Sequence, residues 1–129
     1  MDAEQTNREY SVEEQLRQLD ESIALTRVGG DAELLCEVIG LFLDDYPHSL
    51  EKIRDAVRAG DPSGVEQHAH SLKGSVSIFG AQAAIDAAFS LEKQGRSGDL
   101  TAAPDGLKRL EQALASLKPE LEEIQARNP

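Results

Sequence analysis

The chain has 129 residues, of which 40% are hydrophobic and 29% charged, and its formal net charge is −11. This size and composition suit one water-soluble globular domain, and the excess of acidic residues argues against binding to nucleic acid or to anionic membranes. The N-terminal segment is too polar for a signal peptide, and no apolar run approaches the roughly eighteen residues of a membrane span, which favours a cytoplasmic protein.

Helical periodicity recurs along the chain, whereas the period-two alternation typical of strands is missing. The first predicted helix begins at Ser11, whose hydroxyl can cap it while Glu14 completes a capping box. Gly29 and Gly30 are expected to end this helix, because glycine readily adopts the left-handed conformation found at helix C-termini. The apolar positions of this helix are Leu16, Leu19, Ile23 and Val28.

The second predicted helix begins after Asp31, a favourable N-cap residue, and extends to Arg58. Pro47 lies inside this stretch, so we expect either one kinked long helix or two helices in close succession. Cys36 lies among apolar residues and is expected to be a buried, inert thiol. The apolar stripe of this helix comprises Leu34, Leu35, Val38, Leu41, Phe42, Leu50, Ile53 and Val57.

The third predicted helix begins with an N-cap followed by a proline, the order preferred at helix starts, in Asp61 and Pro62. It carries two histidines and should end near Gly80. An alanine-rich fourth helix is predicted from about residue 81 to residue 95, and the segment GRSGDL is expected to form the loop that begins where it ends.

The last predicted helix covers roughly residues 101–126, with Pro104 in its first turn and a bend expected at Pro119. Short loops favour antiparallel neighbours, so the sequence predicts an all-α fold, an up-and-down antiparallel four-helix bundle with an additional N-terminal helix. We assign residues 11–127 to this bundle domain and predict that residues 1–10 form a disordered or linker-like N-terminus.

The histidines of the third helix, His68 and His70, lie on different sides of it. At about 100° per residue, His70 lies about 140° from the centre of the apolar seam, and His68 lies on the shoulder of the seam. The two rings cannot bind one metal ion from a continuous helix, whose ligands sit at i and i+4, and we interpret His68 as a partly buried structural residue. The seam comprises Val65, Ala69, Leu72, Val76 and Phe79.

Gly74 follows His70 by one helical turn and points away from the apolar seam. A glycine in mid-helix costs roughly 1 kcal/mol relative to alanine, a cost that is usually tolerated where something must approach the backbone closely. Packing against another helix is the alternative explanation. Because Lys73 and Ser77 flank the same polar side, we predict a docking surface with a reactive group in it.

The segment AHSLKGSVSIFGA resembles the signature of histidine-containing phosphotransfer (HPt) domains, in which lysine and glycine follow an exposed histidine at the third and fourth positions. The segments GGDAELLCEVIGLFLDDYP, AVRAGD and LEKQGRSGDL also resemble flanking segments of this family, in the family's order and spacing. The resemblance covers approximately residues 20–117. The ordered set is far more specific than the short motif alone.

By this resemblance, His70 is the phosphoacceptor and Lys73 stabilises the charge of the phosphoryl group. In the family, a polar side chain 22 residues beyond the histidine often accepts a hydrogen bond from the imidazole, and here that position is Glu92. A carboxylate would fix the tautomer but would also favour the protonated, non-nucleophilic ring; a solvated glutamate without this role is the alternative. The docking surface for a receiver domain would comprise Gly74, Gln67 and Ser77.

The resemblance also implies that the protein receives a phosphoryl group from a receiver-domain aspartate and passes it to another, without kinase or hydrolase activity of its own. The implied partners are response-regulator receiver domains and a hybrid sensor histidine kinase, of which the chain could itself be a fragment, and the implied state is monomeric. Magnesium belongs to the receiver, so no metal or other cofactor of its own is expected. Asp44 and Asp45 point about 100° apart on a helix, and we interpret them as a solvated face.

Two functions of other classes compete with phosphotransfer. A non-catalytic helical adaptor that binds receiver or kinase domains would tolerate loss of the histidine, yet His70, Lys73 and Gly74 are all present. A helical-bundle enzyme or metalloprotein would need motifs that the sequence lacks, such as the carboxylate and Glu-x-x-His pairs of di-iron bundles, a nucleophile elbow or a phosphate-binding loop. The sequence therefore favours phosphotransfer.

Overall fold

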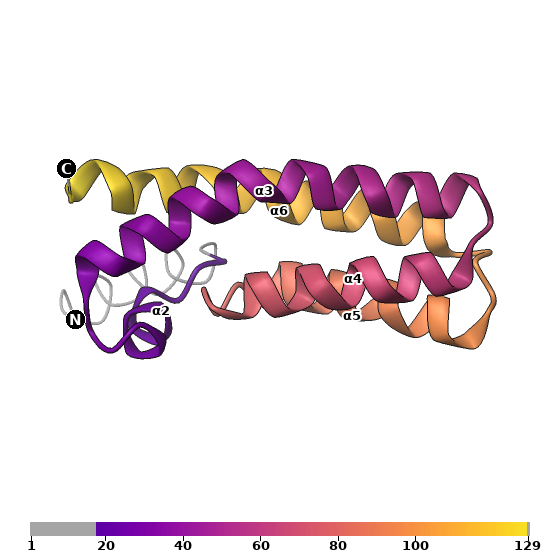
Figure 1. Cartoon of the computed structure of the whole chain (residues 1–129), viewed down its shortest axis with the longest axis horizontal. Coiled ribbons are helices and arrows are strands. Elements are labelled where there is room, and N and C mark those ends of the chain that lie inside the picture. The colour runs from indigo at the N-terminus through magenta and orange to yellow at the C-terminus, as the bar shows by residue number, and fades with distance from the viewer. Residues whose placement is uncertain (1–17, 129) are drawn as a thin grey trace, which may run out of the picture.

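The computed structural model describes residues 18–128, and all regular secondary structure in that range is α-helical. Helices α3 to α6 form an up-and-down antiparallel four-helix bundle, and α2 lies at the end where α3 begins and α6 ends (Figure 1). The predicted all-α bundle with an additional N-terminal helix is therefore confirmed. The helices are α2 (Glu21–Arg27), α3 (Ala32–Arg58), α4 (Pro62–Ser77), α5 (Gln82–Ser97) and α6 (Ala103–Arg127).

Aspartate side chains begin three of these helices, as expected of residues that satisfy the first unpaired backbone N–H groups. The side chain of Asp31 accepts a hydrogen bond from Leu34 N, and that of Asp61 accepts one from Gly64 N, each at 3.1 Å. Asp20 caps α2 in the same way. The predicted starts of the second and third helices are thus confirmed.

The first predicted helix is wrong in extent. Its expected start at Ser11 lies outside the described residues, but residues 18–20 are not helical and α2 begins only at Glu21. Tertiary hydrogen bonds replace the helical ones here. The backbone N–H groups of Gln18 and Leu19 donate to the carboxylate of Glu120 at 3.2 and 3.0 Å. The N–H of Asp20 donates to Phe79 O, two residues beyond the end of α4.

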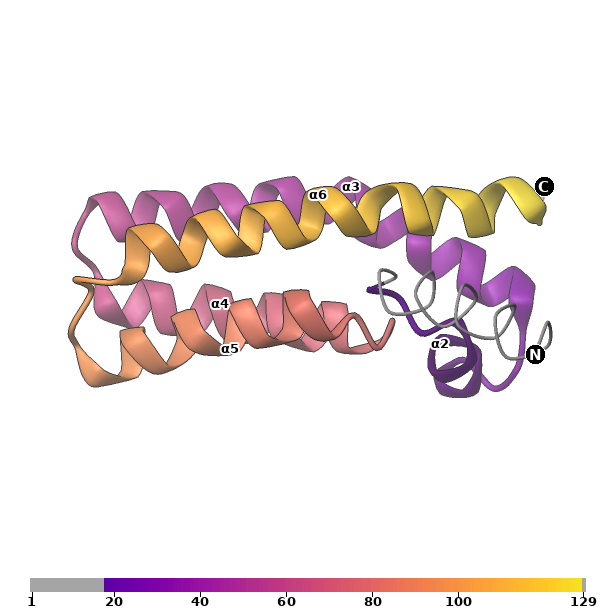
Figure 2. The same ribbon diagram turned by 180° about the vertical axis from the view of Figure 1, so that it is seen from behind.

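The prolines do not interrupt the long helices. α3 continues through Pro47, so the first of the two predicted alternatives, one long helix, is the one observed. The part of α3 near its N-terminus is inclined to the rest (Figures 1 and 2). A change of direction is expected where a proline removes a backbone hydrogen bond. α6 likewise continues through Pro119 as one helix.

The core is aliphatic with a small aromatic cluster. Phe79 is fully buried and packs edge-on against Phe42 at a centroid distance of 5.1 Å, and Phe42 stacks on Tyr46 at 5.3 Å. The predicted seam of the histidine helix is confirmed, since all of its members are buried. They are Val65, Ala69, Leu72, Val76 and Phe79.

Three predicted core residues near the α2 end of the bundle face solvent instead. Leu41 is 70% exposed, Leu34 is 40% exposed and Ile23 is 38% exposed. Leu35 and Ile39 in the same part of α3 are buried. Leu34 and Leu41 are exposed because they lie on another side of the helix, about 100–160° away from these buried residues in helical geometry. Cys36, in the same part of α3, is half-buried rather than buried.

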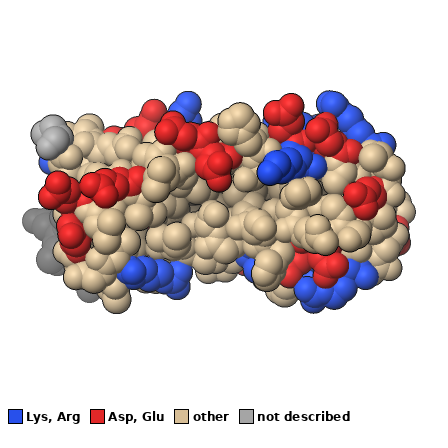
Figure 3. Space-filling model, viewed as in Figure 1, with Lys and Arg blue, Asp and Glu red and all other residues tan. Residues whose placement is uncertain are grey.

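On the face that presents α3 and α4, acidic and basic side chains are interspersed along the edges, and the band between the two helices is largely uncharged (Figure 3). Within residues 18–128, no helix combines the length and the apolar character needed to cross a bilayer.

Candidate functional site

The main chains of α4 and α5 lie in close contact beside Gly95, a buried residue near the C-terminal end of α5. A Cβ atom at this position would lie 2.5 Å from Glu66 N and 2.6 Å from Pro62 O, both main-chain atoms of α4. Main-chain atoms cannot yield without movement of the helix, so only glycine permits this spacing. This packing role of Gly95 was not predicted from the sequence, because the segment GRSGDL was expected to form a loop that begins at Gly95, whereas α5 continues to Ser97.

His70 projects from α4 toward solvent, and its side chain is 66% exposed. Its hydrogen-bond partner is Glu92 on the neighbouring helix α5, whose Oε2 lies 3.0 Å from Nδ1 of His70. The Glu92 side chain is only 3% exposed. The contact between residues 70 and 92 is therefore present, and the alternative of a solvated glutamate is excluded. His68 is half-buried, as predicted.

The Glu92 carboxylate has two further cationic partners. Nζ of Lys73 lies 2.7 Å from Oε1, and Nη2 of Arg96 lies 2.9 Å from Oε2. The pKa of Glu92 is lowered, mainly by the hydrogen bond from Lys73 and then by that from His70, and burial opposes this effect. A buried carboxylate surrounded by donors in this way is held in its ionised form.

The ionised carboxylate determines which nitrogen of His70 is available. A carboxylate can only accept hydrogen bonds, so Nδ1 carries the proton and, in the neutral ring, Nε2 carries the lone pair. No hydrogen bond links Nε2 to any residue from 18 to 128, and the exposed ring presents this nitrogen to solvent. Such an imidazole can act as a nucleophile toward an approaching group.

Gly74 and Lys73 lie next to His70 on α4. A Cβ atom at Gly74 would have no neighbour within 4 Å, so the backbone one turn beyond His70 is open, and helix packing does not explain this glycine. Lys73 is only 25% exposed, and its Nζ lies 4.7 Å from the centre of the Phe89 ring as well as against Glu92. It is therefore a held cation rather than a freely solvated one.

The other two predicted docking residues differ in environment. Gln67 is exposed and lines a shallow depression with His70, Glu92 and Arg96. Ser77 is half-buried, its hydroxyl donates to Lys73 O at 2.7 Å, and its carbonyl accepts from the guanidinium group of Arg27 on α2. The structure thus brings Gln67 to the rim of the site and places Ser77 at the contact with α2.

In the part of the chain that the structure describes, no group of three or more histidine, cysteine, aspartate or glutamate side chains could hold a metal ion. Asp44 and Asp45 are both exposed, in agreement with their interpretation as a solvated face.

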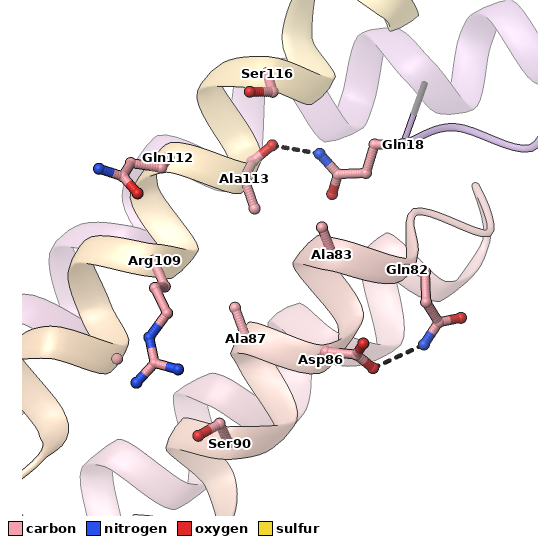
Figure 4. Close-up of a pocket in the computed structure, with 11 residues that line it drawn as sticks. Gln18, Gln82, Ala83, Asp86, Ala87, Ser90, Arg109, Gln112, Ala113 and Ser116 are labelled. Carbon is pink, nitrogen blue, oxygen red and sulfur yellow. Dashed lines mark hydrogen bonds between the residues drawn. The ribbon is translucent and has the colours of Figure 1, made fainter. Parts of the chain in front are cut away.

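A second concave region lies between α5 and α6, on the side of α5 away from α4 (Figure 4). Gln18 reaches into it, donating from Nε2 to Ala113 O and accepting at Oε1 from Ala84 N, both at 2.7 Å. Gln82 and Asp86 on its rim are hydrogen-bonded to each other. Its polar side chains include no histidine or cysteine nucleophile, so His70 remains the candidate reactive group.

Similarity to known proteins identifies the family of the chain. No curated protein sequence matches the chain, but the family model described as Hpt domain matches residues 37–120. The crystal structure of histidine-containing phosphotransfer protein B (HptB) from Pseudomonas aeruginosa PAO1 is similar with a TM-score of 0.81 and 24% identity, covering 87% of this chain and 97% of that one. The HPT domain of a sensor hybrid histidine kinase from Shewanella is similar with a TM-score of 0.75 and 19% identity, over the same shares of the two chains.

The two structural likenesses agree with the bundle described above, and the family match includes the whole of α4 and α5, which carry His70 and Glu92. Since the matched segment is more than half of the 129 residues, the chain belongs to the Hpt domain family, the histidine phosphotransfer modules of two-component phosphorelays.

Proposed function

We propose that this protein is a phosphorelay intermediate in which His70 accepts a phosphoryl group from an aspartyl phosphate of one receiver domain and passes it to an aspartate of another. The observation that carries this proposal is the exposed imidazole of His70, with Nδ1 bonded to the buried Glu92 carboxylate at 3.0 Å and Nε2 open to solvent. An oriented, accessible nitrogen lone pair is the main requirement of an in-line phosphoryl acceptor.

In the proposed transfer, the Nε2 lone pair attacks phosphorus. The Nε2–P bond forms as the P–O bond to the donor aspartate breaks, and that carboxylate leaves with the electron pair. The proton on Nδ1 stays on the ring, which becomes positively charged, and the Glu92 carboxylate stabilises that charge through the existing hydrogen bond. In the onward transfer, a carboxylate of the second receiver attacks phosphorus and the neutral His70 ring is the leaving group.

Lys73 is proposed to stabilise the phosphoryl charge. Its ammonium and the His70 ring bind the two oxygens of the same carboxylate, which keeps the cation beside the reacting ring. Electrostatic stabilisation of this kind does not require a covalent role. Gly74 is proposed to leave room for the loops around the receiver's acidic pocket, and Gln67 to contact the partner at the rim.

The remaining parts of the proposal concern what the partner provides. The receiver domain supplies the magnesium ion, and this chain contributes no metal, kinase or hydrolase activity of its own. The protein acts as a monomer in the cytoplasm, with response-regulator receiver domains and a hybrid sensor histidine kinase as partners. As a second candidate, a non-catalytic adaptor would bind the same domains without accepting the phosphoryl group.

The test is to incubate the protein with a receiver domain carrying a radioactive aspartyl phosphate and to follow the label. We expect acid-labile label on the wild-type protein and on His68→Gln, and none on His70→Gln. His68→Gln is the matched control, because it removes a half-buried imidazole two residues away. Equal labelling of His70→Gln would refute the assignment, and binding of the receiver without any labelling of the wild type would favour the adaptor.

A further inference from the structure

Arg96 is a residue of the site to which the phosphotransfer proposal assigns no role. It lies one turn after Glu92 on α5, and its Nη2 is 2.9 Å from Oε2 of Glu92, the oxygen that also accepts from His70. The Nε atom of the same guanidinium group is 2.9 Å from Oε2 of Glu66 on α4. Arg96 therefore links the two helices directly beside the histidine ring.

The local backbone makes this link possible. Gly95, the residue before Arg96, brings α5 against the main chain of α4 at Glu66. The guanidinium group can then reach Glu92 on its own helix and Glu66 on the other, using two of its donors at once. The pKa of Arg96 is raised, chiefly by the hydrogen bond to Glu66, so the group carries its positive charge at every accessible pH.

The ion pairs beside His70 join two carboxylates to two cations, and Lys93 lies nearby on the Phe89 ring that Lys73 also contacts. Glu66 and Lys73 are contributed by α4, and Glu92 and Arg96 by α5. An uncompensated carboxylate beside an imidazole favours the imidazolium form, which has no lone pair for attack on phosphorus. Lys73 meets one oxygen of Glu92, but Arg96 meets the oxygen that His70 uses.

We propose that Arg96 is a positioning residue for His70: it holds Glu92 Oε2 in place and offsets its charge, so that the ring keeps a lone pair on Nε2 at neutral pH. This inference rests on the proposal that His70 is the phosphoacceptor. It explains how a glutamate can occupy a position where a carboxylate alone would disfavour the nucleophilic form of the ring.

The test is the pH dependence of phosphoryl transfer to Arg96→Met, which keeps much of the aliphatic side chain but removes the charge. We expect the rise of the transfer rate with pH to move to higher pH by about one unit, with the wild-type rate recovered at alkaline pH. Arg96→Lys should restore most of the wild-type profile. The matched control is Glu66→Gln, which leaves Arg96 charged and should move the profile in the opposite direction.

A purely structural role of Arg96 would lower the transfer rate equally at every pH, and that result would overturn the inference. A pH profile of Arg96→Met that superimposes on the wild-type profile would also overturn it. If the circular dichroism of Arg96→Met shows a loss of helix, the pH profile of Glu66→Gln is the test instead. A Glu66→Gln profile that is not shifted from the wild-type profile overturns the inference. NMR titration of the His70 ring without any receiver should show the same shifts. A wild type that accepts no label while these NMR shifts are present would refute the proposed function and leave the role of Arg96 intact.

Discussion

The two sides of α5 carry polar clusters with opposite properties. Toward α4, the buried Glu92 binds His70, Lys73 and Arg96, yet Nε2 of His70 remains open to solvent. Toward α6, the side-chain amide of Gln18 donates to Ala113 O on α6 (Figure 4) and accepts from Ala84 N on α5. A polar cluster is suited to chemistry when one accessible atom keeps bonding capacity, whereas a satisfied cluster stabilises the fold.

The largest effect is expected at the α4 side, from Gly95→Ala. The added Cβ atom would lie 2.5 Å from Glu66 N, and a main-chain atom cannot move away on its own. We expect a loss of about 3 kcal/mol in the free energy of unfolding, at the upper end of what overpacking costs. Urea denaturation followed by circular dichroism measures it.

The control for this variant is Gly74→Ala, a change in α4 at a position where an added Cβ atom has no neighbour within 4 Å. An added methyl group there meets nothing, and the higher helix propensity of alanine should stabilise the protein by about 1 kcal/mol. If Gly95→Ala and Gly74→Ala change the free energy of unfolding by the same amount and in the same direction, Gly95 is not required for the close approach of α4 and α5.

The α6 side is tested by Gln18→Ala. The change removes the side-chain bonds to Ala113 O and Ala84 N. Ala113 O lies inside α6 and keeps its helical partner, but Ala84 N lies in the first turn of α5 and loses its acceptor, which should cost about 2 kcal/mol of unfolding free energy. Phosphoryl transfer to the folded protein should stay at the wild-type rate. If the transfer rate of Gln18→Ala falls while its stability is unchanged, the polar cluster between α5 and α6 contributes to phosphoryl transfer and not to the stability of the fold.

The accessibility of the open side is tested by Gly74→Gln. The larger side chain should fill the space beside His70 and reduce the rate of transfer from a phosphorylated receiver about tenfold, equivalent to about 1.4 kcal/mol. The fold should remain intact, since glutamine is a better helix former than glycine. Gly74→Ala is again the control and should transfer normally. Unchanged transfer in Gly74→Gln would remove the argument for docking at this surface.

The smallest expected effect is a difference in acid stability between the wild type and Glu92→Gln. Because the pKa of Glu92 in the folded protein lies below its unfolded value of 4.5, its ionisation stabilises the fold above that pH. This contribution is lost as the pH falls through the lower folded value. Glutamine does not titrate, so the melting temperature of Glu92→Gln should decline less steeply below pH 4.5. Equal slopes would contradict the ionised, hydrogen-bonded state of Glu92.

Sequence periodicity and capping residues were sufficient to predict most of the bundle. Asp31 and Asp61 mark helix starts because their side chains satisfy backbone groups three residues away, an interaction local to the sequence. The prediction is wrong for residues 18–20, where hydrogen bonds to Glu120 and to Phe79 O, both far away in the sequence, replace helical ones. It is also wrong for Leu41, which the predicted apolar stripe included although it lies about 120–160° around α3 from the buried Leu35 and Ile39.

For the site, the position of His70 off the apolar seam, with Gly74 one turn beyond it, could be predicted from the sequence. Helical geometry relates residues three to four apart without reference to the rest of the chain. The burial of Glu92 against His70, and the contact of Arg96 with the same oxygen, arise from the packing of α5 against α4. Those contacts depend on the distance between α4 and α5, which Gly95 sets through main-chain packing that no local pattern encodes.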